Sequence, residues 1–300
     1  MSNNPASPAD NNLAGISYLL AGVFVLTIMD VIAKFLVESD FSPFQILAIR
    51  GYIITSAFLI WTAARGQLVT LKTDRVKHHA VRGAIGFGAP FFFFTALGLM
   101  PLADVIVVTF AAPFVMTALS VPLLKETVGR YRWASIAVGF VGVVIVVQPG
   151  AGTLQTGALF ALAACLSYSL VNIMTRWMAA TESPIRLVFY FNLSTAVIGT
   201  CALPFVWKPM SVEDTLTIVA LAAVAVLGHL LMTTAFTKAP LGVVTPFEYS
   251  ALIWSTAFGF LIWGDFPAEN VWLGAGIIVA SGLYMIHREA VNRRKSHMPS

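Results

Sequence analysis

The sequence has little charge and almost no cysteine, and each shortage excludes a class of protein. Of its 300 residues, 11% are charged and 58% are hydrophobic, whereas a typical soluble domain carries about 25% charged residues. The two cysteines, Cys165 and Cys201, lie in apolar stretches without metal-ligand spacing. A soluble domain, a disulfide-stabilised domain and a cysteine-bound metal centre are therefore not expected.

Several catalytic and nucleotide-binding motifs are also missing. The chain has no phosphate-binding glycine loop, so it cannot drive transport with ATP by itself. It has no H-E-x-x-H, no G-x-G-D aspartates and no nucleophile elbow, which argues against an intramembrane enzyme. No cofactor and no metal are expected.

Apolar blocks of about twenty residues, the length that spans a bilayer, recur along the whole chain. They predict an all-α polytopic membrane protein with ten transmembrane helices, bounded by proline and glycine. The predicted spans are 13–37, 44–64, 81–100, 101–123, 131–149, 155–179, 184–206, 214–237, 241–263 and 270–287.

The basic residues predict the orientation. Ten spans place fifteen of the eighteen Lys and Arg on one side of the membrane; Lys208 lies on the other side, and Lys34 and Arg50 lie within spans. By the positive-inside rule, both termini are cytoplasmic, and the protein is a multi-pass protein of the cell inner (plasma) membrane. The net charge of +4 therefore reflects topology and does not indicate nucleic-acid binding.

The two halves of the chain resemble each other. A shift of 139 residues aligns "TALGLMPLADVIVVTFAAPF", from Thr95, with "TAFTKAPLGVVTPFEYSALI", from Thr234, and it aligns Glu126 with Asp265. A shift of 142 residues places Asp30-x-x-x-Lys34 over Asn172-x-x-x-Arg176. Five spans in each half make the second copy enter the membrane upside down, so the prediction is two inverted five-helix repeats, an arrangement typical of transporters.

The predicted organisation has four parts. Residues 1–12 form a disordered cytoplasmic tail, and 288–300 form a basic cytoplasmic tail. Between them, 13–149 form the first repeat and 155–287 the second.

Several segments resemble the drug/metabolite transporter superfamily in its ten-span EamA-type branch. They are "DVIAKFL", "ILAIRGYIITSAFL", "ALGLMPLADVIVVTFAAPFVMTALSVPLLKE", "GFVGVVIVVQPG" and "TPFEYSALIWSTAFGFLIWGDFP", and the similarity runs from about residue 13 to 287. The segment "VRGAIGFGAPFFFF" is similar to a subgroup that includes S-adenosylmethionine and riboflavin transporters. The resemblance implies a permease for small metabolites.

Three charges inside the first two spans form a predicted cluster. A charge at the centre of a membrane helix costs about 2.5–3.5 kcal/mol, so each is a functional candidate. Asp30 and Lys34 share one helix face, and Arg50 in the next span is predicted to reach the same carboxylate. The cluster either orients the two helices as a salt bridge or takes part in gating.

Glu248, in the ninth span, is the main candidate for coupling to a proton or to the substrate. It follows Pro246 and has no base near it in the sequence, so its carboxylate can carry a proton. His229 in the eighth span is at a comparable depth and is a possible partner, although a lone histidine in an apolar span is more often a packed, hydrogen-bonded residue. Tyr249 offers a stacking surface.

Two uncharged polar residues complete the candidate site. Asn172 and Tyr168 lie on one face of the sixth span and could hydrogen-bond a substrate.

These features favour a secondary active transporter that works by alternating access. The predicted substrate is a small zwitterionic or cationic metabolite with a ring, such as an amino acid, S-adenosylmethionine or riboflavin, moved by proton-coupled export or exchange. The alternatives are an uptake facilitator on the same fold and, less favoured, an intramembrane enzyme or a channel. The expected partners are the substrate and the lipid bilayer, with the chain a monomer or homodimer.

Overall fold

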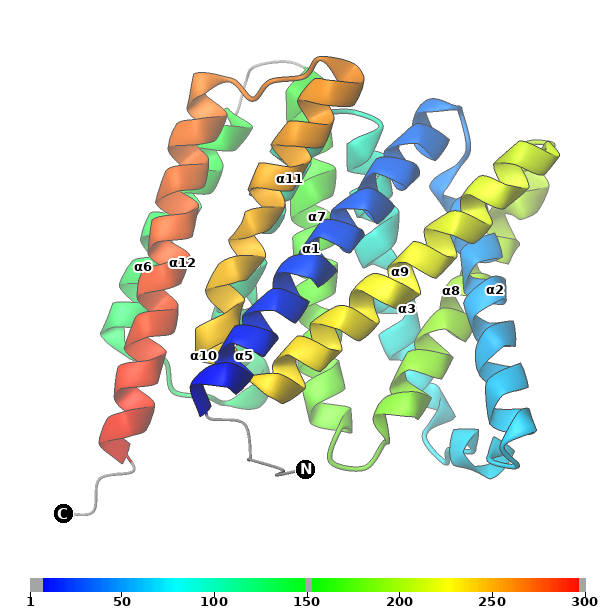
Figure 1. The fold of residues 1–300 in the computed structure, drawn as a ribbon, viewed down its shortest axis with the longest axis horizontal. Helices are drawn as coiled ribbons and strands as arrows, with labels where there is room; N and C mark the ends of the chain where they lie inside the picture. Colours follow the sequence, from blue (N-terminus) through cyan, green and yellow to red (C-terminus); the bar gives the residue numbers. More distant parts are fainter. Residues whose placement is uncertain (1–7, 149–152, 297–300) are drawn as a thin grey trace, which may run out of the picture.

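The structure, a computed structural model, describes residues 8–148 and 153–296. Within these residues it consists of helices joined by loops (Figure 1). The outer parts of both predicted tails and the predicted turn at 149–152 lie outside the described residues. The elements are α1 (Pro8–Glu38), α2 (Pro43–Ala64), the 3₁₀ turn η1 (Leu68–Leu71), α3 (Val76–Leu97), α4 (Leu102–Thr109), α5 (Ala112–Leu124), α6 (Arg130–Val147), α7 (Thr153–Met178), α8 (Pro184–Val206), α9 (Val212–Lys238), α10 (Leu241–Val244), the 3₁₀ segment η2 (Thr245–Ser250), α11 (Ala251–Phe258), the π-helical η3 (Gly259–Trp263) and α12 (Glu269–Ser296).

The chain passes through the bundle ten times. Nine passages of the described chain are helices long and apolar enough to cross a membrane, and the tenth is the broken run from α10 to η3. The start of α1 and the end of α12 lie on one face of the bundle, at the bottom of Figure 1, which is here called the terminal face; the other is the far face. α1 begins at Pro8, so residues 8–12 of the predicted tail are part of a helix.

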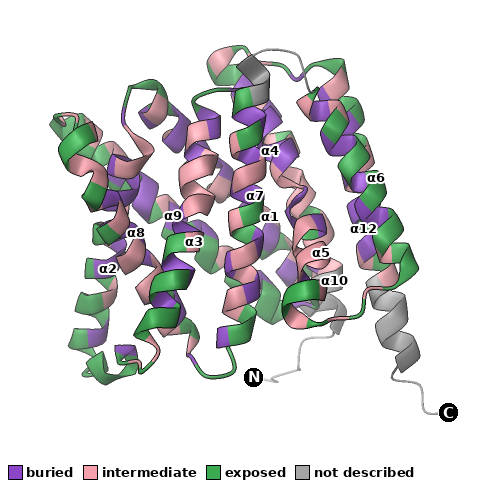
Figure 2. Ribbon diagram, turned by 180° about the vertical axis from the view of Figure 1, so that it is seen from behind, coloured by how far each residue is buried: buried purple, intermediate pink, exposed green. Residues whose placement is uncertain are grey.

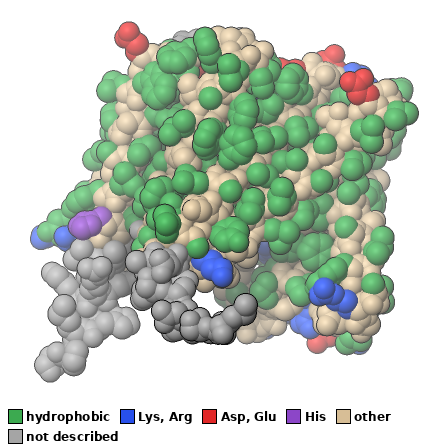
Figure 3. All heavy atoms as spheres, in the orientation of Figure 1, with side chains coloured by type: hydrophobic (Ala, Val, Ile, Leu, Met, Phe, Trp, Pro, Cys, Tyr) green, Lys and Arg blue, Asp and Glu red, His purple; other side chains and the backbone are tan. Residues whose placement is uncertain are grey.

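The surface matches a bilayer environment. Figure 2 shows buried residues on the faces that helices turn toward one another and exposed residues on the outer faces. The outer faces are apolar, and Figure 3 shows hydrophobic side chains across the middle, acidic side chains near the far face and most of the visible Lys and Arg near the terminal face. Apolar side chains that would be unfavourable in water are favourable against lipid.

Helix packing follows the repeat. α1 packs along α9, and α7 packs along α3, which are equivalent helix pairs in the two halves. α2 packs on its own counterpart α8, and α6 on its counterpart α12. A two-fold axis in the membrane plane produces this pattern in inverted repeats.

Glycines permit the close approach of α6 and α12. A Cβ on Gly142 would lie 2.9 Å from the Gly274 carbonyl oxygen, and a Cβ on Gly274 would lie 2.6 Å from the Gly142 carbonyl oxygen. Because a backbone atom cannot move aside as a flexible side chain can, only glycine fits at these two positions.

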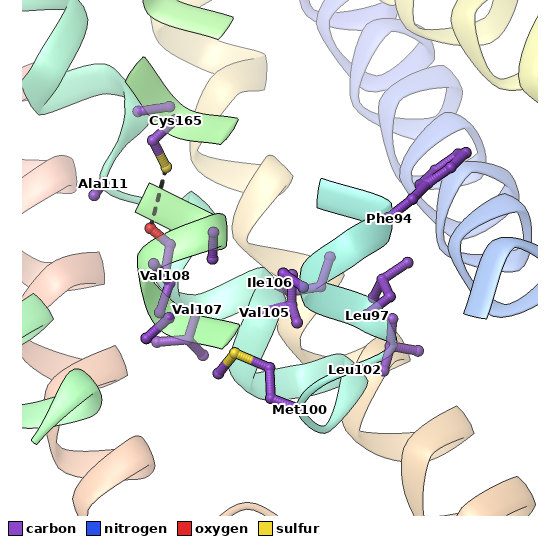
Figure 4. Packing of buried hydrophobic residues seen from close by; sticks show 14 of the residues in the cluster. Phe94, Leu97, Met100, Leu102, Val105, Ile106, Val107, Val108, Ala111 and Cys165 are labelled. Atoms are coloured by element: carbon purple, nitrogen blue, oxygen red, sulfur yellow. Dashed lines mark hydrogen bonds between the residues drawn. The ribbon is translucent and has the colours of Figure 1, made fainter. Parts of the chain in front are cut away.

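The fourth passage is broken at Phe110–Ala111, where the sequence predicted a continuous span. Pro113 lacks the N–H that would bond to the Thr109 carbonyl, so one helical hydrogen bond is missing. Side chains of α7 bond to the carbonyls around the break. Cys165 Sγ donates to the Val108 oxygen at 3.4 Å (Figure 4). Ser169 Oγ donates to the Ala112 oxygen at 3.2 Å.

The ninth passage is broken as well, which corrects the predicted continuous span 241–263. It runs through a short α-helix, a 3₁₀ segment that contains Pro246, a second α-helix and a π-helical end. Proline has no N–H for the helix ladder, and the tighter 3₁₀ turn accommodates that loss. The fourth passage of each predicted repeat is therefore discontinuous, at corresponding positions.

Loops are clamped together on both faces. On the far face, Gln45 Nε2 donates to the Lys208 carbonyl at 2.8 Å, and the Lys208 N–H donates to Gln45 Oε1 at 2.8 Å. On the terminal face, Glu182 accepts hydrogen bonds from Thr73 Oγ1 at 2.8 Å and from Arg186 Nη1 at 3.4 Å. These clamps join equivalent loop pairs of the two halves.

Glu182 lies in the loop between α7 and α8, outside the spans. Burial acts to raise the pKa of its carboxyl, but the hydrogen bonds from Thr73 and Arg186 and the pairing with His79 hold the pKa below its ordinary value. The carboxylate therefore stays charged through the physiological pH range.

Candidate functional site

The breaks of the fourth and ninth passages lie against each other. Phe110 lies at the break of the fourth passage and Tyr249 at that of the ninth, and the 139-residue shift superposes these two positions. Their rings contact edge-to-face, with centroids 5.0 Å apart and planes 84° apart. Two symmetry-related residues that touch mark the two-fold axis, and discontinuous helices near such an axis are where transporters bind substrate.

Glu248 lies directly at this point, in the 3₁₀ segment η2. Within the described part of the chain, its side chain has no salt bridge and no hydrogen bond, but it interacts electrostatically with Tyr168 of α7 and with Tyr249. The structure thus brings Glu248 and Tyr168, predicted from separate spans, close together. An acid without a fixed partner is free to bind a proton or a cation.

Tyr168 and Asn172 are neighbours on α7, as predicted. Asn172 Nδ2 donates to the Tyr168 carbonyl at 2.7 Å, and the two side chains interact. Tyr168 is 50% exposed, and it interacts electrostatically with Glu248 of a later span in the same half. Its surface is therefore available to a ligand beside Glu248.

Tyr249 lies between Phe110 and α12. Its ring faces Phe110, but its hydroxyl lies against Gly282 of α12, where any Cβ would overlap it. The ring is thus available for stacking, while its hydroxyl is held in the contact with α12.

The charge cluster of the first two spans is only partly as predicted. Asp30 and Arg50 attract each other electrostatically, and Asp30 is buried. Lys34 is not paired with Asp30, so that part of the prediction is wrong. Its Nζ lies 2.9 Å from Glu38 Oε1, one helical turn further along α1.

His229 belongs to this cluster and not to Glu248. It interacts electrostatically with Arg50, so the predicted partnership of His229 with Glu248 is wrong. The candidate residues therefore form two groups, one at the helix breaks (Glu248, Tyr249, Tyr168, Asn172) and one between α1, α2 and α9 (Asp30, Arg50, His229).

Three functional candidates were missed in the sequence. Glu38 and Trp263 contact Lys34 at the far face, and Asp104 is a buried acid in the first turn of α4 whose Oδ1 has no hydrogen-bond partner. Asp104 could have been found as an acid inside the repeated segment "PLADVIVV". Trp263 could not have been singled out from the sequence, because tryptophan is common at membrane interfaces.

Metal binding finds no support in the described residues, where no group of three or more His, Cys, Asp or Glu side chains is placed to hold an ion. The candidate site offers a carboxylate, aromatic rings and amide groups. Such groups bind and release an organic ligand.

Comparison with known proteins gives relatives along almost the whole chain. The S-adenosylmethionine uptake transporter of Rickettsia bellii (strain RML369-C) is 26% identical over 275 residues, which cover 92% of this chain and 94% of that protein. The riboflavin transporter of Vibrio cholerae serotype O1 is 23% identical over 286 residues, covering 94% of this chain and 96% of that protein.

One solved crystal structure shares the fold, with a TM-score of 0.58 and 20% identity over 93% of this chain and 98% of that one. The sequence profile of the EamA-like transporter family matches residues 13–148 and again residues 155–287. With both halves matched, the chain belongs to the EamA-like transporter family.

Proposed function

We propose that this chain is a secondary transporter that moves a small, positively charged, ring-bearing metabolite across the inner (plasma) membrane by alternating access. The observation that carries the proposal is the meeting of two interrupted helices at Phe110 and Tyr249, with Glu248 beside them. Interrupted helices expose free backbone groups only where protein or a ligand can satisfy them.

The chemistry of the site favours a cation over a neutral substrate. Glu248 supplies negative charge, and the rings of Tyr168, Tyr249 and Phe110 provide faces that attract cations. S-adenosylmethionine carries a sulfonium, an amino acid group and an adenine ring, and the Rickettsia bellii relative is an uptake transporter for it. It is therefore the first substrate to test.

Glu248 also provides a means of coupling. When a cation leaves, the carboxylate needs another positive charge, and a proton can take that place. Exchange of a proton for a cationic substrate at one acid would serve export and uptake alike. The termini are proposed to be cytoplasmic, since most Lys and Arg flank the terminal face.

The test is transport by purified protein in liposomes, with labelled S-adenosylmethionine as the probe. Glu248→Gln keeps the shape of the side chain, and we expect pH-driven flux to fall by about tenfold or more, equivalent to about 1.4 kcal/mol of lost coupling. Glu213→Gln is the matched control, because Glu213 is an exposed acid in the first turn of α9.

The outcomes separate the two roles of Glu248. If only proton coupling is lost, substrate counterflow survives in Glu248→Gln. If Glu248 binds the cation, counterflow is lost as well. Wild-type flux and counterflow in Glu248→Gln, or no flux of the probe in the wild type, would refute the proposal, and riboflavin flux in the wild type would then favour a neutral ring-bearing substrate.

A further inference from the structure

The repeat relates two contacts at opposite faces that have no assigned role. The 142-residue shift places Lys34 of α1 over Arg176 of α7. The 139-residue shift places Trp263 and Asp265, at the end of the ninth passage, over Leu124 and Glu126, at the end of the fourth. Each basic residue lies close to the end of the broken passage in the other half.

At the far face the contact is extensive. Lys34 Nζ is 2.9 Å from Glu38 Oε1, and Glu38 Oε2 accepts a hydrogen bond from Trp263 Nε1 at 2.6 Å. The Lys34 ammonium also lies 5.3 Å from the centre of the Trp263 ring, and the Phe35 ring lies 4.9 Å from it. These four residues form what is here called the far latch.

The far latch also holds α3. Lys34 Nζ donates to the carbonyl oxygens of Leu97, at 2.8 Å, and Met100, at 3.2 Å. One ammonium thus joins the end of α1 and the end of α3 in the first half to η3 in the second half. Its side chain is only 5% exposed, so its partners cannot be replaced by water without opening the contact.

At the terminal face the equivalent contact is a single ion pair, here called the terminal latch. Arg176 Nη2 lies 2.6 Å from Glu126 Oε1, and it also joins the two halves. The side chain of Arg176 is 68% exposed and that of Glu126 is 34% exposed. Water competes for an exposed pair, which contributes about 0–1 kcal/mol at most.

We propose that the two latches are the gates of the transporter, that they open alternately, and that the weaker terminal latch is the one that opens more readily. The proposal rests on alternating access, the mechanism proposed above. The far latch must break for the ends of α1 and η3 to separate, whereas the terminal latch opposes separation of α7 and α5 only weakly. The purely structural alternative is that both contacts merely stabilise the fold.

The test is hydrogen–deuterium exchange of the protein in lipid nanodiscs, which needs no substrate and is therefore independent of which metabolite is carried. Glu38→Gln removes the charge that holds Lys34, and Trp263→Phe removes only the indole donor while keeping a ring. In both, we expect backbone amides of 259–268 to exchange about tenfold faster, because local opening governs exchange. Asp40→Asn is the matched control, since Asp40 lies in the same loop region and has no salt bridge among the described residues.

The second readout distinguishes a gate from a structural contact. If the gates alternate, opening the far latch closes the terminal one, so residues 122–130 should exchange about twofold more slowly in Glu38→Gln. Glu126→Gln should change exchange at 122–130 by less than about threefold, because the terminal latch is already weak.

Three results would overturn the proposal. One is exchange at 259–268 within twofold of wild type in both far-latch variants. Another is an equal rise throughout the protein, including α6, which would mean general destabilisation. The third is faster exchange at both faces in Glu38→Gln, because alternating gates cannot open together.

Discussion

Gly282 is the position where a single added methyl group should disturb the candidate site, by displacing Tyr249. In Gly282→Ala, the new Cβ would overlap the Tyr249 hydroxyl and lie 2.9 Å from the ring carbon Cζ. Carbon atoms pack at about 3.5–4.0 Å, so Cζ must move by roughly 0.6–1.1 Å. This displaces the ring from Phe110, with which it makes its edge-to-face contact.

The stability change should be small, because two effects oppose each other. Overpacking costs about 1–3 kcal/mol, and replacing glycine by alanine in a helix gains about 1 kcal/mol. A net loss of about 0–2 kcal/mol lets the protein fold while Tyr249 is displaced. We therefore expect normal yield with substrate counterflow reduced several-fold.

The control is Gly276→Ala on the same helix, where nothing lies within 4 Å of the new Cβ. The double variant Gly282→Ala/Tyr249→Phe removes the overlapping oxygen and should recover part of the flux. Counterflow of S-adenosylmethionine in liposomes, with thermal unfolding of the same samples, measures both effects. Wild-type counterflow in Gly282→Ala, or equal loss in the Gly276→Ala control, would show that Tyr249 does not shape the site.

Three further predictions test the packing, the charges and the loop clamp. Gly142→Ala should lower thermal stability, because its Cβ would lie 2.9 Å from a backbone oxygen, at a cost of about 1–3 kcal/mol, whereas the control Gly276→Ala should not. Neutralising Asp30 or Arg50 alone should reduce protein yield more than neutralising both, because each single variant leaves an unpaired charge inside the membrane. Yield losses that simply add up in the double variant would contradict the pairing. The pKa of Glu182 is lowered in the folded protein, so the stability that its charge contributes is fully present above the ordinary carboxyl pKa of about 4.3. That stability is lost only as the pH falls through the lowered pKa. The difference in unfolding free energy between wild type and Glu182→Gln should therefore be the same at about pH 5 and at about pH 8.

Periodicity and composition were enough to predict the ten passages and the repeat. Each passage is a long apolar block, and the equivalent segments share turns and prolines, so the count does not depend on tertiary contacts. The breaks were not predicted. A proline is tolerated inside a membrane helix elsewhere in this chain, at Pro90 of α3, so proline alone does not specify an interruption.

The pairing of Lys34 shows why the site could be predicted only in part. Lys34 has an acid four residues before it, Asp30, and another four residues after it, Glu38. Helix geometry allows either pair, and an acid on the N-terminal side is slightly favoured in an isolated helix. Trp263, distant in sequence, decides the choice because it donates to Glu38 and holds that carboxylate beside the ammonium.

The two halves share the same helix packing but differ in the charges inside their spans. Asp30 and Arg50 of the first half correspond, by the 142-residue shift, to Asn172 and Asn192 of the second. Asn172 Nδ2 and Asn192 Nδ2 donate to carbonyls of their own helices, those of Tyr168 at 2.7 Å and Val188 at 2.9 Å.

An amide bonded to its own helix does not constrain the neighbouring helix, whereas attraction between Asp30 and Arg50 joins α1 to α2. The first half therefore carries two opposite charges, on neighbouring helices, that attract each other. The second half contributes Glu248, which has no such partner within the described chain. We therefore expect the carboxylate of Glu248, which no opposite charge attracts, to be the coupling acid, and the charges of the first half to hold α1 against α2. The double variant Asp30→Asn/Arg50→Asn gives the first half the uncharged residues of the second. We expect pH-driven transport by this variant to remain dependent on Glu248, and only the contact between α1 and α2 to loosen. Loss of the pH dependence in that double variant would place the coupling acid in the first half instead.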